Sequence, residues 1–124
     1  MSLQEKFLER QLAAYERVME KISDFELLAG EGKERRDFGT RVTNALVEIL
    51  SAFERGFMFF DNATFKMFDE RIFSAFFNHE FDVFLKNKEY ASWYDELNRR
   101  LSGEILGSMR DFFQHKFPEL YEPL

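Results

Sequence analysis

Arg110 and His115 stand five residues apart near the C-terminal end of the sequence, in the segment RDFFQH. An arginine can bind phosphate and stabilise negative charge that develops in a transition state. A histidine can donate or accept a proton during a reaction. The two side chains are therefore candidate functional residues.

The same segment resembles the R-x4-H motif of HEPN-type ribonucleases, and the preceding residues Glu104 to Met109 resemble the approach to that motif in some members. The resemblance implies a small all-helical protein that dimerises and cleaves RNA at a composite site, with Arg110 and His115 as catalytic residues. A structural interpretation remains open beside it. In that interpretation Arg110 pairs with an acidic residue and His115 interacts with the end of a helix.

The sequence around the two histidines does not fit the common helical metal sites. A di-iron bundle uses Glu-x-x-His pairs, but phenylalanine stands three residues before both His79 and His115. The zinc-protease pattern H-E-x-x-H begins at His79 but has Val83 in place of the second histidine. Cysteine is absent, which excludes disulfides, thiolate metal sites and thiol nucleophiles. We therefore expect no metal and no cofactor.

Apolar residues recur at steps of three and four along almost the whole chain, which predicts helices. Proline, the strongest helix breaker, occurs only at positions 118 and 123. Ser2 and Glu5 have the spacing of a capping box at the start of the first helix. The expected helices cover residues 2 to 22 or 30, about 33 to 60, about 64 to 85 with a bend or restart near Asn78-His79, and about 92 to 117.

The expected helices are joined by short polar connections, which favour antiparallel packing of helices that follow one another in the chain. The length of 124 residues is typical of one domain. The sequence therefore predicts a single all-α domain over residues 1–124, built as an antiparallel bundle of about four helices.

Phenylalanine is unusually abundant, with 17 residues in the chain. Burying each ring is worth roughly 1.5 to 3 kcal/mol, so leaving several of them in water is unfavourable. One interpretation is an aromatic core within a single copy. A second is that rings off the main apolar stripe pack across a homodimer or partner interface, and a third is a pocket for an apolar small molecule. The candidate interface residues are Phe59, Phe73, Phe77 and Phe84.

The net charge of -6 weakens attraction to phosphate backbones and anionic membranes, so RNA is disfavoured as a partner. Residues 33–41 hold a basic cluster interleaved with acids, which is typical of a solvated, salt-bridged surface, with RNA or an acidic partner as the alternative. Arg99 and Arg100 form a second basic cluster. No secretory signal pattern and no apolar run of membrane-spanning length is seen, so we expect a cytoplasmic protein without membrane association.

These observations favour a non-enzymatic helical interaction or assembly module, expected to be homodimeric, that buries a Phe-rich surface against another chain. The alternatives are a small HEPN-like ribonuclease that uses Arg110 and His115, and a bundle that binds an apolar small ligand.

Overall fold

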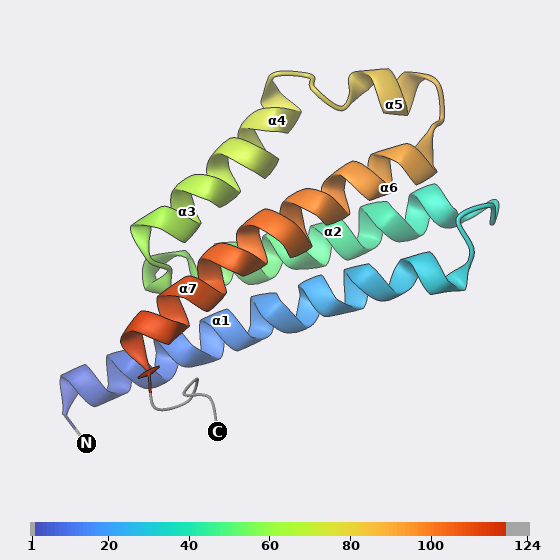
Figure 1. The fold of residues 1–124 in the computed structure, drawn as a ribbon. Helices are drawn as coiled ribbons and strands as arrows, with labels where there is room; N and C mark the ends of the chain where they lie inside the picture. Colours follow the sequence, from blue (N-terminus) through green and yellow to red (C-terminus); the bar gives the residue numbers. More distant parts are fainter. Residues whose placement is uncertain (1, 119–124) are drawn as a thin grey trace.

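The computed structural model describes residues 2–118, and every regular element in that range is a helix. The chain runs out along α1, returns along α2, runs out again through α3 and α4, and returns through α6 and α7 (Figure 1). The predicted all-α class is confirmed. The predicted number of helices is not confirmed, because a short separate helix, α5 (Asp82–Lys86), lies between the third and the last passage of the chain.

The first helix, α1, spans Leu3–Leu27 and continues into a 3-10 turn, η1, over Leu28–Glu31. The sequence allowed an end near Ile22 or near Gly30, and the observed end agrees better with the second. The break itself comes at Gly32, whose φ of 105° lies in the left-handed region. Glycine has no Cβ, so it adopts this conformation without steric cost.

The second helix, α2, spans Phe38–Arg55 and is shorter at both ends than the predicted range 33–60. Residues 33–37 form turns instead. At the other end Gly56 caps α2, and the chain enters a 3-10 turn, η2, over Phe57–Phe59. Phe57 therefore no longer follows the helical period of the apolar stripe.

The third passage is one continuous rod made of three segments. It begins at Asn62, two residues before the predicted start near 64, because the carboxylate of Asp61 accepts a hydrogen bond from the backbone N–H of Thr64 and caps the helix. The middle segment is π-helical. The rod ends before His79, whose φ is 60°, so the predicted bend or restart is a complete break before α5. The segments are α3 (Asn62–Phe68), η3 (Asp69–Phe73) and α4 (Ser74–Phe77).

The last passage also contains a π-helical segment between two α-helices. It starts at Tyr90, two residues before the predicted start at Ser92, and it ends before Pro118 as predicted. Tyr90, the first residue of this passage, packs its ring against Gly39 of α2. A Cβ added at Gly39 would lie only 2.8 Å from a carbon of this ring. The segments are α6 (Tyr90–Asn98), η4 (Arg99–Ile105) and α7 (Leu106–Lys116).

The core lies between α1, α2, the rod and the last passage, each of which contributes buried side chains. Its aromatic members stack on one another. Tyr94, for example, lies 4.9 Å from Phe25 and 5.4 Å from Phe38 between ring centroids. The largest fully buried side chains are Tyr15, Ile22, Phe25, Phe38, Ile49, Phe68, Ile72, Phe81, Tyr94, Leu97, Leu101 and Ile105.

Tyr15 of α1 connects the first helix to the start of the rod. Its hydroxyl donates to Oδ1 of Asp61 at 2.5 Å and accepts from the backbone N–H of Asp61 at 2.7 Å. Burial raises the pKa of the Tyr15 hydroxyl, and its hydrogen bond to the Asp61 carboxylate raises it further. The folded protein therefore holds this proton more tightly than the unfolded chain does.

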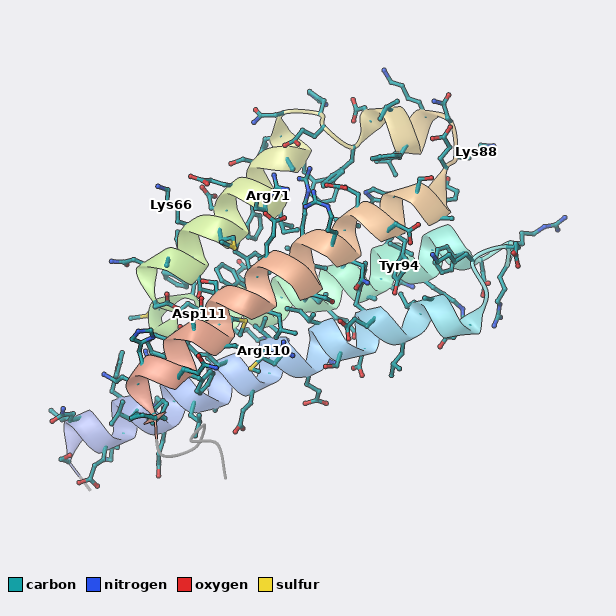
Figure 2. The ribbon with its side chains drawn as sticks, viewed as in Figure 1. Lys66, Arg71, Lys88, Tyr94, Arg110 and Asp111 are labelled. Carbon is teal, nitrogen blue, oxygen red and sulfur yellow. The ribbon has the colours of Figure 1, made fainter. Side chains whose placement is uncertain are left out.

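Arg100, part of a basic cluster in the sequence, is 6% exposed and joins the two π-helical segments. Its guanidinium donates to Glu96 at 2.9 Å, to Glu80 at 3.0 Å and to the backbone carbonyl of Arg71 at 2.8 Å. It also lies over the ring of Phe81, 5.0 Å from the centroid. Figure 2 shows Arg71 on the flank of the rod that faces the last passage. These contacts fix the position of the rod.

Replacing Arg100 with methionine should lower the free energy of unfolding by about 2 to 4 kcal/mol, because the carbonyl of Arg71 loses its donor and Glu96 loses a buried partner. Urea denaturation followed by circular dichroism measures the change. The matched control is Arg99→Met, because the Arg99 side chain is 56% exposed and solvent screens its ion pairs, so the loss should be much smaller. Equal losses in both variants would contradict the role of Arg100.

The raised pKa of Tyr15 predicts that stability falls as the pH rises beyond about 10, where a tyrosine in the unfolded chain ionises. Above that pH, unfolding releases a proton that the folded protein retains, so the free energy of unfolding decreases by up to about 1.4 kcal/mol per pH unit. Denaturation at several pH values, with tyrosinate absorbance as a second readout, measures this slope. The Tyr15→Phe variant should have a shallower slope, and an unchanged slope would contradict the prediction.

Candidate functional site

A groove of about 380 Å³ runs along the surface between α2 and the rod. One side comes from α2 and η2, and the other from α3 and η3. The residues that line it are Leu50, Phe53, Glu54, Phe57, Phe65, Asp69 and Phe73.

The floor of the groove is the ring of Phe53, which is only 3% exposed. This ring stacks on Phe68 with 4.0 Å between the centroids and on Phe60 with 4.8 Å. It also contacts the groove residues Phe65 at 5.7 Å and Phe73 at 6.2 Å. Aromatic rings held on several sides have little rotational freedom, so the floor is already formed before anything binds.

Both rims have the same order of side chains, with a carboxylate between apolar residues. On the rim from α2 and η2, Glu54 lies between Leu50 and Phe57. On the rim from the rod, Asp69 lies between Phe65 and Phe73. Because α2 and the rod run in opposite directions and are joined by η2, the two carboxylates both lie near the middle of the groove.

The π-helical segment η3 keeps the second rim in one row. In a regular α-helix, eight residues of separation would rotate Phe73 by about 80° away from Phe65. The i→i+5 hydrogen bonds of η3, such as that from the N–H of Ser74 to the carbonyl of Asp69, turn the chain more slowly. Phe73 therefore lines the same groove as Phe65, while Ile72 remains fully buried.

The rims expose aromatic surface and uncompensated charge. Phe57 is 53% exposed and Phe65 is 42% exposed. Among the ion pairs within residues 2–118, none involves Glu54 or Asp69. The groove therefore offers apolar contact along its length and negative charge at its centre.

Of the four predicted interface residues, only Phe73 lines the groove. Phe59 is half-buried and packs on Phe7 with 5.3 Å between ring centroids. Phe84 is half-buried against the core, and Phe77 is 80% exposed at the end of the rod. The ring contacts of the described residues connect none of these four to another. An interface made by all four remains a prediction.

The ten phenylalanines between positions 57 and 84 divide by exposure into three groups. Phe60, Phe68 and Phe81 are buried in the core, while Phe57, Phe65 and Phe77 are exposed. The other four are half-buried. The interpretation as an aromatic core within one copy therefore accounts for only part of this set.

Arg110 and His115 both lie exposed on α7. Figure 2 shows Arg110 on the flank of α7 next to α1. The Nδ1 atom of His115 lies 2.8 Å from the backbone carbonyl oxygen of Asp111. A separation of five residues corresponds to about 140° around a helix, so one copy does not bring the two side chains together. A composite site would need a second copy of the chain.

Within residues 2–118, His, Asp and Glu side chains do not gather in groups of three or more that could hold a metal ion. In the same range, none of the helices combines the length and the apolar character needed to cross a membrane.

Comparison of the chain with protein-family models, curated proteins and solved structures gives no match.

Phe57 and Phe65 were not predicted to be surface residues, because both continue a regular apolar spacing in the sequence. The available signal was Gly56, since glycine commonly ends a helix and the residues after it leave the helical period. Next to Phe65, the side chain of Thr64 is buried on the inner face of the rod. Its hydroxyl oxygen lies 2.9 Å from that of Ser108. The neighbouring Phe65 is turned toward the groove.

We expect Arg110→Ala, His115→Ala and the unmodified protein to show the same background activity when labelled single-stranded RNA is incubated with each of them. The reason is that the two side chains diverge within one copy. A ribonuclease that used His115 for proton transfer would instead lose about 100-fold to 10,000-fold in rate in His115→Ala. Such a loss, seen with RNA and reproduced in Arg110→Ala, would support the nuclease hypothesis.

Proposed function

We propose that the protein is a helical interaction module that buries its Phe-rich groove against another protein chain. The observation that carries this proposal is the exposure of Phe57 and Phe65 on opposite rims above a preformed aromatic floor. Exposed apolar patches bordered by polar residues are typical of binding surfaces. Aromatic side chains at the centre of such surfaces commonly supply most of the binding energy.

The shape of the groove favours a protein segment over a small molecule. From Phe65 to Phe73 the rim extends over about two helical turns, on the order of 10 Å. It is formed by two helices lying side by side, which is how grooves that accept an amphipathic helix are usually built. The two carboxylates at the centre would be unfavourable neighbours for a purely apolar ligand.

The charges also bear on the predicted homodimer. If two copies met groove to groove, the carboxylates Glu54 and Asp69 of one copy would approach those of the other. Like charges opposed across an interface weaken binding. We therefore propose that a different chain occupies the groove, and the homodimer remains a prediction that a measured mass in solution tests.

A photo-reactive phenylalanine analogue placed at Phe57 or Phe65 in living cells should form one discrete covalent adduct with a partner chain. The matched control is the same analogue at Leu27, which is 69% exposed but lies outside the groove, and no such adduct is expected there. Adding Phe73→Ala should remove most of the adduct, because this change opens the end of the groove.

The adduct is identified by its mass and by peptide sequencing. An adduct between two copies of this chain would support the interaction module but contradict a different chain as partner. Absence of an adduct at both groove positions, or an equal adduct at Leu27, would overturn the proposal.

A further inference from the structure

We propose that the occupant of the groove is an amphipathic helix of a partner protein that carries lysine or arginine on both flanks of its apolar stripe. This inference rests on the proposed function and adds the chemical class of the partner. It comes from the position of the two unpaired carboxylates relative to the apolar ends of the groove.

The apolar contacts of the groove lie in two groups. Phe57 and Phe65 form one group near η2, and Leu50 and Phe73 form the other about two turns away. A helix in the groove would therefore place apolar side chains at positions i and i+7 against these groups. Residues at i+3 or i+4 would face the ring of Phe53 on the floor.

The carboxylates lie on opposite rims at the level between the two apolar groups. A helix in the groove would have one flank against Glu54 and the other flank against Asp69. This arrangement corresponds to the charged positions on either side of the apolar seam in a coiled coil, where opposite charges select the partner. Cations on both flanks of the guest helix would complement it.

The surrounding cations do not neutralise these carboxylates. Lys66 on the rod pairs with Glu70 at 3.9 Å, one turn along the same helix. Arg55, which follows Glu54 in the sequence, lines a separate cleft between α1 and α2 together with Arg17 and Lys21. The chain as a whole has a net charge of -6. The groove is therefore electrostatically negative, and an acidic guest would be repelled.

The test uses three fluorescent helical peptides of about 18 residues that differ in one property each. The first has leucine at i, i+4 and i+7 with lysine on both flanks. The second has the same leucines with glutamate on the flanks, and the third keeps the lysines but has serine in place of the leucines. Fluorescence anisotropy gives the dissociation constant of each peptide with the full chain, at low and at physiological salt.

We expect the leucine–lysine peptide to bind about 10-fold or more tightly than the leucine–glutamate peptide, with the serine peptide weakest. Exposed ion pairs are individually weak, so two pairs together with the loss of repulsion account for a preference of this size. In the double variant Glu54→Gln/Asp69→Asn the preference should fall to within about two-fold, while Phe65→Ala should weaken both leucine peptides.

The matched control removes two negative charges elsewhere, with Glu9→Gln/Glu34→Gln. Both residues are exposed, and neither lines the groove. This variant should keep the full preference. If it lost the preference as the groove variant does, the attraction would be a general effect of net charge and the inference would be overturned.

Two further outcomes separate this inference from the proposed function. Equal binding of the lysine and glutamate peptides, both weakened by Phe65→Ala, would overturn the basic partner and leave the interaction groove standing. Binding of none of the peptides would also overturn the basic helix as occupant, while the covalent adducts at Phe57 and Phe65 would decide the function independently.

Discussion

One buried guanidinium, that of Arg100, determines where the rod lies relative to the rest of the molecule. Removing a charged group from water is costly, and the cost is offset here because each edge of the guanidinium meets an acceptor. One acceptor is a backbone carbonyl in η3. The contact therefore fixes where the rod lies along the last passage, as well as the distance between the two. A second ion pair, Arg71 with Glu104 at 3.0 Å, supports the same position. The groove depends on this interaction because the rod is one of its two walls.

The spacing of apolar residues at steps of three and four was sufficient to predict the helical class and the approximate course of the chain. Each helix is stabilised mainly by burying its one apolar face. Two kinds of feature could not be predicted in this way. The helix end at Gly56 was overlooked, so α2 was predicted to continue past this glycine. The π-helical segments could not be recognised from apolar spacings of three and four. One extra residue in a turn only changes which later residues share a helix face. The burial of Arg100 was not predicted from its basic cluster, because it depends on contacts from distant parts of the chain.

The candidate groove was harder to predict than the fold, for a physical reason. An exposed ring and a buried ring have the same sequence signature when each stands in an apolar repeat, and only the neighbouring helix decides which of them is covered. Phe68 is covered and Phe65 is not, although they are three residues apart on one helix. Glu54 and Asp69 were not predicted as site residues either, because acids on helix surfaces are common and their presence in one groove depends on the tertiary structure.

Both walls of the groove come from one uninterrupted stretch of sequence, residues 50–73. During synthesis on the ribosome this stretch emerges before the last passage, and contacts between nearby residues need little loop closure. Both groove walls can therefore form early in synthesis. Arg100, whose hydrogen bonds fix the position of the rod, is synthesised later. Until Arg100 has emerged, α2 and the rod lack the hydrogen bond that ties the carbonyl of Arg71 to the last passage.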